Sequence, residues 1–512
     1  MLELIKNILL YSENKPLLFT SLYFWLFFAF VLIIYSIIYR KNPLRNAFLF
    51  FMSLFFYYKS GGYFFTLLVF STLVDYTAGL LIYKSSTKFK KKLFLSISII
   101  TNLSLLGYFK YAYFFTDIFN QAFHSDFQVI NNLALWTNNL TGSEFSISQI
   151  ILPVGISFFT FQTISYSVDV YREKLKPVRS IIDFGFYVSF FPQLVAGPIV
   201  RAAEFMPQLY QKFRLTKQEF GHAVFLILNG LVKKMMISDY ISINYVDRIF
   251  EAPSSFTGFE NLMAVYGYSI QIYCDFSGYT DIAIGVALLL GFRLPINFNS
   301  PYKAVNITDF WHRWHISLST WLRDYLYIPL GGSKKGKTRT TINIMITMLL
   351  GGLWHGANLR FVIWGGLHGL GLVIHKLWVK INTSLNKYYN PRISKNLFIH
   401  FISVFLTFNL VSFAWIFFRA ENMESAKAMI TQIVENFQLE LIPIMITSYY
   451  KIFVVIFIGL LIHWLPSSFK ENLRGIFIKS HIAVKIVIVI VIVFFLFQAK
   501  SAEIQPFIYF QF

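Results

Sequence analysis

The sequence predicts an all-α, polytopic integral membrane protein, and the composition and a series of long apolar runs support that prediction. Hydrophobic residues make up 56% of the 512 residues, aromatic residues 19% and charged residues only 14%. Soluble domains carry about 25% charged residues, and a soluble fold of this length could not bury so much apolar surface. The composition excludes a disordered chain, a secreted disulfide scaffold and an ordinary cytosolic enzyme.

Eleven apolar runs are candidate transmembrane helices, since a helix needs about 20 apolar residues to cross the bilayer. The runs are 17–39, 47–58, 63–83, 93–113, 150–168, 184–200, 261–292, 340–375, 397–418, 452–465 and 482–498. Because some are long and others are short, we expect about ten to twelve crossings.

Three of these runs need separate reasons. The first contains no charge and is too long for the apolar part of a signal peptide, so we expect it to be retained. The run 184–200 contains Pro192 and Pro198 and is followed by Arg201, which favours a broken or re-entrant segment shielded by protein. The last run alternates Ile and Val like a strand, but a lone strand in lipid leaves its backbone unpaired, so we expect a helix.

The distribution of charge predicts the topology. The formal net charge is +20, and the basic residues form short clusters between apolar runs, which is typical of cytoplasmic loops rather than of a nucleic-acid-binding face. The clusters lie at 40–45, 84–92, 172–179 and 334–339. The segments 117–148 and 421–440 lack this excess and are assigned to the outside.

The run from Thr308 to 332 is the first candidate site. Thr308 is placed to cap a helix whose first turn holds Asp309. On a continuous helix, His315 would share a face with both Trp311 and His312. An interfacial helix with an aromatic belt is the alternative. A metal site would need a third ligand that the sequence does not provide, and the single cysteine, Cys274, offers no basis for one.

The second candidate is the run 349–360, which breaks an apolar segment in mid-course. Gly351, Gly352 and Gly356 weaken the helix, and His355 lies in the break. A buried neutral imidazole is suited to act as a general base near pH 7. A core histidine that is hydrogen-bonded to a neighbouring carbonyl is an equally good reading of the residues alone.

Two further runs carry polar groups into apolar surroundings. Asp275 and Asp281 could orient an imidazole or pair with Arg313 or Arg323, or they could cap or kink a discontinuous helix. The run 189–202 could form a re-entrant loop near an anionic head group, or serve only to pack helices together.

Four motifs together resemble the membrane-bound O-acyltransferase family, and within it the bacterial alginate and peptidoglycan O-acetyltransferase subgroup. They are WHRWHISLSTWLRD at 311–324, GLWHGA at 352–357, FFPQLVAGPI at 190–199 and CDFSGYTDI at 274–282. The resemblance covers about residues 15–420. It implies a many-helix membrane fold around a central tunnel, with re-entrant or interfacial helices. The expected division is N-terminal helices and external loop at 1–145, catalytic core at 146–420 and C-terminal helices at 421–512.

The resemblance also implies site residues. The two family histidines map onto His355, the main catalytic residue, and His315, the supporting one, whereas no role maps onto His312. The implied supporting or tunnel residues are Trp311, Trp314, Ser317, Arg323, Asp324, Trp354, Asn358, Asp275, Tyr279 and Asp281. The implied re-entrant loop residues are Pro192, Gln193, Gly197, Pro198 and Arg201. No metal and no tightly bound cofactor are expected.

The function implied is acyl transfer in the bacterial inner membrane. The donor would be a cytoplasmic thioester such as acetyl-coenzyme A, and a periplasmic partner of the SGNH type would complete the O-acetylation of a cell-envelope polysaccharide. We favour peptidoglycan, because the Lys-, Phe- and Ile-rich composition fits an AT-rich genome, in which alginate production is less expected. The alternatives are an alginate-like exopolysaccharide, D-alanyl transfer to teichoic acid, a non-catalytic scaffold, and a proton-coupled transporter or flippase that uses both histidines as a relay.

Overall fold

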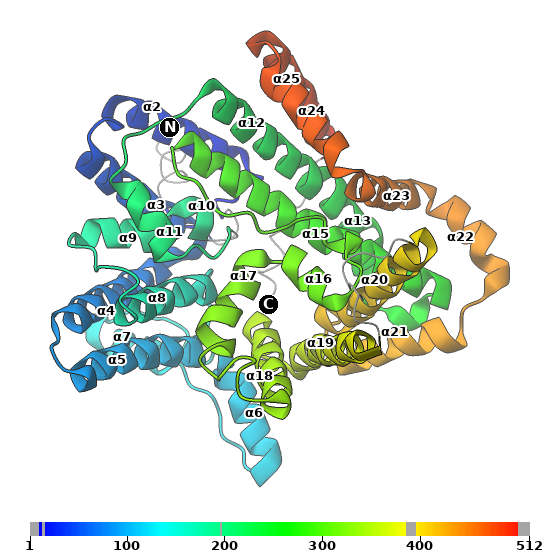
Figure 1. Cartoon of the computed structure of the whole chain (residues 1–512), viewed down its shortest axis with the longest axis horizontal. Helices are drawn as coiled ribbons and strands as arrows, with labels where there is room; N and C mark the ends of the chain where they lie inside the picture. The colour runs from blue at the N-terminus through cyan, green and yellow to red at the C-terminus, as the bar shows by residue number, and fades with distance from the viewer. Residues whose placement is uncertain (1–9, 13–15, 195–196, 386–395, 500–512) are drawn as a thin grey trace.

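The computed structural model describes residues 10–12, 16–194, 197–385 and 396–499, and all regular structure in these residues is helical (Figure 1). The predicted all-α class is confirmed. The helices are α2 (Leu22–Ile38), α3 (Asn42–Gly61), α4 (Phe65–Lys84), α5 (Lys88–Leu106), α6 (Ala112–Phe123), α7 (Asn132–Thr141), α8 (Ile156–Tyr171), α9 (Ile181–Ser189), α10 (Phe191–Leu194), α11 (Ala202–Leu209), α12 (Lys217–Leu231), α13 (Asp239–Ile241), α14 (Asp247–Glu251), α15 (Gly258–Leu289), α16 (Ile307–Arg313), α17 (Ile316–Leu322), α18 (Lys337–His355), α19 (Leu359–Leu385), α20 (Leu397–Arg419), α21 (Met423–Glu435), α22 (Ile442–Ser448), α23 (Tyr450–Trp464), α24 (Ser467–Lys479) and α25 (Ile482–Ala499).

Within the described ranges, six helical stretches are long and apolar enough to cross a membrane, or up to eight if each of two bent helix pairs forms one span. We expected ten to twelve crossings. Part of the difference lies in Asn42–Lys84, which counts as one stretch of 43 residues but contains α3 and α4, separated by Gly62 at a φ of 63°. Each of these two helices has 20 residues and is therefore about 30 Å long, which matches the hydrocarbon core by itself.

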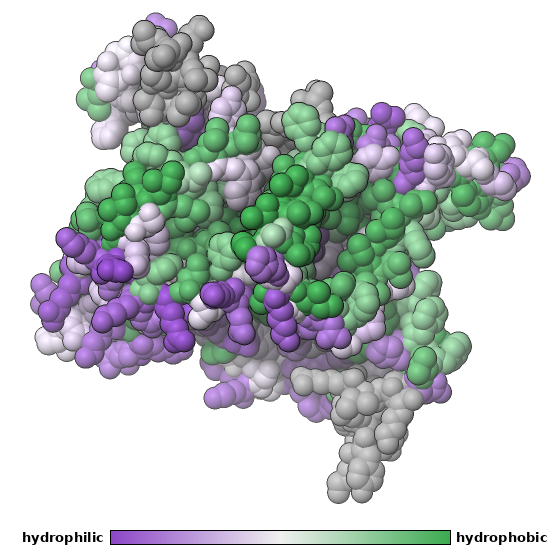
Figure 2. All heavy atoms as spheres, turned by 90° about the horizontal axis from the view of Figure 1, so that it is seen from above, coloured by the Kyte–Doolittle hydropathy of each residue, from purple (hydrophilic) through white to green (hydrophobic). Residues whose placement is uncertain are grey.

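The surface has the pattern of a protein embedded in lipid. Figure 2 shows a broad hydrophobic belt with hydrophilic residues gathered along its lower edge. Two of the basic clusters that we assigned to the cytoplasm meet in the fold, since Lys91 bonds Glu173 at 2.8 Å. The cluster at 172–179 also reaches η7 (Arg323–Tyr327), where Arg172 donates to the carbonyl oxygen of Asp324. These contacts place the two clusters close together, as expected for loops on one side of the membrane.

Helix α15 runs through the middle of the molecule beside α12 (Figure 1). It begins with a capping box between Thr257 and Glu260, which satisfies the first backbone N–H groups. It then continues without a break for 32 residues, and 83% of its most apolar window is buried. The sequence-based alternative of a discontinuous helix around Asp275 and Asp281 is therefore wrong.

Both aspartates of α15 pair with lysines of η3 (Val232–Ser238), the π-helical continuation of α12. Lys234 bonds Asp275 at 2.5 Å and Asp239 at 2.7 Å, and Lys233 bonds Asp281 at 2.7 Å. The expected pairing with Arg313 or Arg323 is wrong. Charges inside a membrane protein need partners, and here the partners come from the neighbouring helix.

The segment 184–200 is broken, as predicted, and is enclosed by protein. Helix α9 ends at Ser189, the short α10 follows, and the chain then turns at Gly197 and Pro198; Val195 and Ala196 lie outside the described residues. The turn is tight, because the N–H of Gly197 donates to the carbonyl oxygen of Gln193 and a side chain at 197 would collide with the Gln193 backbone. The described residues 183–194 and 197–200 are all buried.

Replacing Gly230 by Ala tests the close approach of α12 and α15. The added methyl group would collide with the carbonyl oxygen of Gly278 and with Ile282, and overpacking of this kind costs roughly 1–3 kcal/mol. We expect the melting temperature of the detergent-solubilised protein to fall by a few degrees. The control is Gly475→Ala in α24, where the methyl group meets no atom within 4 Å and the higher helix propensity of Ala should preserve or raise the melting temperature. An unchanged melting temperature for Gly230→Ala would show that this crossing is not tightly packed.

Candidate active site

The predicted continuous helix through His315 is wrong. Helix α16 is capped by Asn306, whose side chain accepts the N–H of Asp309, while Thr308 bonds His375 instead. The helix ends at Arg313, and the backbone of His315 then takes the left-handed conformation, with a φ of 41°. Non-glycine residues rarely adopt this conformation, and it is found where the surrounding structure enforces it.

This break separates the two histidines of the motif. His315 is fully buried, whereas His312 is exposed and faces a surface groove described below. The break leaves the two histidines in different surroundings, because the His315 ring packs against Phe276 and Trp354.

Asn297 holds His315 in place. Its Oδ1 accepts the backbone N–H of Ser317 at 3.1 Å and the Ser317 hydroxyl at 2.9 Å, and it lies 3.2 Å from Nδ1 of His315. Since the backbone N–H can only donate, this Asn297 atom is an oxygen, and Nδ1 of His315 must carry the proton. In the neutral ring, Nε2 is then a hydrogen-bond acceptor. The Ser317 hydroxyl also accepts the N–H of Ile199 at 3.0 Å, which ties the broken segment to this loop.

His355 is the last residue of α18, and only 3% of it is exposed. The chain leaves the helix in an extended conformation at Gly356. The turn back into α19 is close, because a side chain at Gly352 would collide with the α19 backbone at Phe361 and Gly365. The glycine-rich break therefore lies between two antiparallel helices, with the histidine at the end of the first.

Aromatic rings enclose the His355 imidazole. Its ring centroid lies 4.9 Å from Trp354, 5.0 Å from Trp364 and 5.2 Å from Phe418. The indole of Trp354 also lies 6.2 Å from the ring of His315. Both family histidines therefore contact one tryptophan, although they are 40 residues apart in the sequence.

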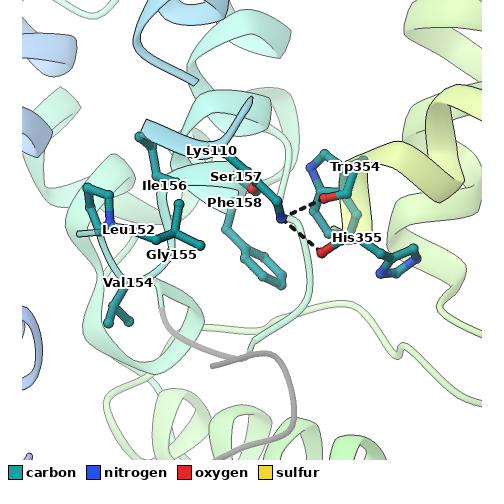
Figure 3. A pocket seen from close by; sticks show the side chains of 10 residues that line it. Lys110, Leu152, Val154, Gly155, Ile156, Ser157, Phe158, Trp354 and His355 are labelled. Carbon is teal, nitrogen blue, oxygen red and sulfur yellow. Dashed lines mark hydrogen bonds between the residues drawn. The ribbon is translucent and has the colours of Figure 1, made fainter. Parts of the chain in front are cut away.

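A small cavity of about 90 Å³ opens beside the end of α18. Figure 3 shows the Lys110 ammonium between the 152–158 segment and the backbone of Trp354 and His355, with the imidazole on the opposite side from Lys110. The cavity is lined by Lys110, Leu152, Pro153, Val154, Gly155, Ile156, Ser157, Phe158, Trp354 and His355. Segment 152–158 directly follows the loop that we assigned to the outside, so we call this the external cavity.

A groove runs along the side of α18, away from the end that carries His355. Two adjoining cavities of about 320 Å³ and 420 Å³ share Thr308, His312, Ile344 and Leu372. The first is also lined by Trp311, Ile316, Ser319, Thr320, Leu322, Arg323, Tyr327, Thr347 and Met348. The Tyr327 hydroxyl bonds Ser333 at 2.7 Å, so the groove opens beside the basic loop assigned to the cytoplasm.

The inner wall of this groove approaches the buried histidine. Trp311 lies 5.8 Å from Trp364, and Trp364 contacts His355. One indole thus separates the imidazole from the groove wall, while Trp354 and His355 themselves line the cavity at the other end.

Arg201 and Arg323 both bond Asp324 at 2.7 Å. Burial acts to raise the pKa of the Asp324 carboxyl, but the two guanidinium groups outweigh it, so that the pKa lies below its ordinary value. The charged residues at the end of the 311–324 motif therefore join the 190–201 segment to the α17–η7 segment.

The other residues named from the sequence motifs are buried in the core, packed against aromatic rings or involved in helix capping. Trp314 is fully buried and stacks on Phe310 at 5.7 Å. Tyr279 lies 5.6 Å from Phe19, and Asn358 is exposed and caps the start of α19 with its side chain. Pro192 and Gln193 are buried within α10.

Sequence reasoning missed Asn297, Trp364 and Lys110. The first two lie outside the motifs and carry no distinctive local pattern. Lys110 did offer a signal, because it is an ionisable residue inside the apolar run 93–113, where such residues are functional candidates by default.

The arrangement suits acyl transfer between two openings. It provides a buried imidazole in an aromatic enclosure and a second buried imidazole with a fixed tautomer, with a cavity beside the end of α18 and a groove wall one indole away. In the part of the chain that the structure describes, no group of three or more His, Cys, Asp or Glu side chains is placed to hold a metal ion.

Comparisons with known proteins agree with this geometry. The model of the MBOAT, membrane-bound O-acyltransferase family matches residues 45–415. A peptidoglycan O-acetyltransferase of Helicobacter pylori is 38% identical over 415 residues, which cover 76% of this chain and 73% of the relative. A probable alginate O-acetylase AlgI of Pseudomonas syringae is 40% identical over 387 residues, covering 75% and 69%. A teichoic acid D-alanyltransferase of Bacillus subtilis is 29% identical over 281 residues, covering 53% and 69%.

The family match extends over most of the chain and includes both histidines, the broken segment and the central helix α15. With its apolar helices, the chain is a multi-pass membrane protein and an acyltransferase. It belongs to the membrane-bound O-acyltransferase family.

Proposed function

We propose that the chain is an O-acetyltransferase of the bacterial inner membrane. It takes an acetyl group from a cytoplasmic thioester, acetyl-coenzyme A, and passes it to a periplasmic partner of the SGNH type, which O-acetylates a cell-envelope polysaccharide. The observation that carries the proposal is the position of His355, which lies at the end of α18 between an external cavity and a groove that opens beside the basic loop.

His355 is the catalytic base in this proposal. Its imidazole takes the proton of the acceptor hydroxyl while the hydroxyl oxygen attacks the thioester carbonyl carbon. The C–S bond then breaks and the leaving thiolate takes the proton from the imidazolium, so a thioester and a hydroxyl become an ester and a thiol. Since the thioester is already activated, the protein has only to align the reactants and exclude water.

His315 orients the acceptor. With its Nδ1 proton directed at Asn297, the neutral ring presents Nε2 as an acceptor, which suits a hydrogen bond from a hydroxyl group. The same tautomer cannot donate from Nε2 to an oxyanion, so we assign His315 to orientation rather than to stabilisation of the developing negative charge.

The donor occupies the groove beside α18. The apolar wall of Ile344, Met348 and Leu372 fits the pantetheine arm of a thioester, and Arg323 stands at the groove next to a loop with four further basic residues at 334–339. A diphosphate group favours such basic surroundings. Of the supporting residues implied by the motifs, Trp311 and Arg323 line this groove.

Peptidoglycan is the polymer that we favour. The relatives that act on peptidoglycan and on alginate are 38% and 40% identical to this chain, so identity does not separate them, and the preference rests on the composition discussed above. Deleting the chain in its host should remove base-labile acetate from purified peptidoglycan, as measured by mass spectrometry of muropeptides. Loss of acetate from an exopolysaccharide instead would support the alginate alternative.

His355→Ala should abolish transfer of labelled acetyl groups to the acceptor. A general base typically contributes about 10²–10⁴-fold to the rate, so we expect at least a hundredfold loss while the variant remains folded and inserted. The matched control is His400→Ala, since His400 is exposed on α20 and its replacement should leave the rate unchanged. Acetyl transfer at the normal rate by His355→Ala would refute the assignment, and passage of acetate without covalent transfer would favour a transporter.

Leu372→Trp should block the groove. A larger side chain at this position would fill the apolar part shared by the two cavities, so the KM for acetyl-coenzyme A should rise at least tenfold with a smaller change in kcat. Leu370→Trp is the control, because Leu370 is 51% exposed on the same helix and does not line the groove. If the donor KM is the same in both variants, the donor does not bind in this groove.

A further inference from the structure

The end of α18 is held by two side chains from a distant helix. Within the π-helical turn η2 (Gly107–Tyr111), the Tyr111 hydroxyl donates to the carbonyl oxygen of Leu353 at 2.9 Å. The Lys110 ammonium donates to the carbonyl oxygens of Trp354 at 2.8 Å and His355 at 2.9 Å (Figure 3). Three consecutive carbonyl groups, ending at the catalytic residue, are thus bonded by two consecutive residues more than 240 positions away in the sequence.

Without these donors, the buried carbonyl groups would lack hydrogen bonds and would destabilise the fold. The last four carbonyls of a helix have no intrahelical donor, and many helices solve this with a left-handed glycine that folds the backbone over its own end. Here Gly356 is extended, with φ of −161° and ψ of 147°, so the next residues do not close the helix in that way. Side chains of η2 supply the missing donors.

Lys110 also brings an ionisable group to the C-terminal end of α18. The C-terminus of a helix carries partial negative charge, which a nearby cation stabilises. An ionisable side chain within an apolar helix is expensive and is retained where it serves a purpose. Lys110 places its ammonium group at the helix end that carries His355, and in the same cavity.

The local backbone makes this contact possible. The chain switches from α5 to a π-helical turn over residues 107–111 before α6 begins, and such turns concentrate at functional sites because they re-aim side chains. At this turn, both Lys110 and Tyr111 reach the end of the same helix.

We propose that Lys110 and Tyr111 form a clamp that positions His355 for catalysis. This inference rests on the proposed function of His355 as the base. Neither clamp residue bonds the imidazole itself; both act through the backbone that carries it. Without the clamp, the last turn of α18 frays, and the imidazole loses its alignment with the acceptor and the donor.

Lys110→Met tests the clamp through the kinetic constants. We expect kcat for acetyl transfer to fall at least tenfold, with the donor KM changed by less than twofold, because the groove that binds the donor is untouched. Lys110→Arg keeps a cation with several donors and should restore kcat to within about threefold of the wild type. Tyr111→Phe removes one donor and should reduce kcat by a smaller factor.

The matched control is Lys92→Met, since Lys92 is exposed near the cytoplasmic end of the same helix, and it should leave kcat unchanged. Lys110→Ala, which also removes the donor, is the alternative if Lys110→Met fails to fold. Wild-type kcat in a folded Lys110→Met or Lys110→Ala variant would overturn the inference.

A second measurement does not depend on activity. The chain has one cysteine, so Cys274→Ser provides a background in which His355→Cys introduces a single thiol at the end of α18. Because the wild-type residue is buried, we expect slow alkylation of this thiol, accelerated at least threefold by Lys110→Met and not by Lys92→Met.

The two measurements separate the two proposals. An unchanged alkylation rate would overturn the clamp even if the chain transfers acetyl groups. If Lys110→Met accelerates alkylation but the wild-type protein transfers no acetyl group, the clamp is retained and the proposed function is refuted.

Discussion

Polar groups inside a membrane protein must find partners within the protein, because lipid offers none, and this constraint shapes the molecule from its centre to its site. Asp75 in α4 accepts hydrogen bonds from Ser98, Asn102 and Ser167, which bind α4, α5 and α8 together. Ion pairs with Lys234 and its neighbour join α12 and η3 to α15 in the same way. The polar residues of the spans therefore set which helices are adjacent, and the apolar side chains fill the space between them.

Several buried polar atoms around His355 have no hydrogen-bond partner among the described residues. Around His355, the indole nitrogens of Trp311 and Trp364 and both ring nitrogens of His368 are buried, and none has a hydrogen-bond partner in the described part of the chain. Buried polar atoms are rarely left in this state. Unpartnered buried atoms of this kind also occur elsewhere in the described interior, at Thr160, Gln162 and Tyr166 among others, and around His355 they lie next to the residue that we propose handles a hydroxyl group and a thioester.

Apolar length was enough to predict an all-helical membrane protein, because it is a local property of the sequence, but it overestimated the crossings, since six to eight stretches of the described residues are long and apolar enough. The pairing of α15 was not predictable, since either aspartate could have met an arginine of the 311–324 motif. Only the close approach of Gly230 and Gly278 brings the lysines of η3 into reach. The helix break before His315 was also missed. The Asn297 side chain accepts the backbone N–H of Ser317 at the start of α17, in place of a hydrogen bond within a continuous helix. Helical spacing in the motif could not predict a contact with a residue outside it.

One helix, α18, carries both the groove and His355. Helix α18 has 19 residues and is therefore about 28 Å long, but it is not among the described helices that are long and apolar enough to cross a membrane. It begins at the basic loop, carries the groove on its flank through Ile344 and Met348, and ends at His355 beside the external cavity. Motif matching identified the histidine, but it could not identify Lys110, because the residue that fixes the far end of this helix belongs to a different helix. In the proposed mechanism, α18 joins the groove on its flank to the end that carries His355, and the hydrogen bonds from Lys110 and Tyr111 fix that end.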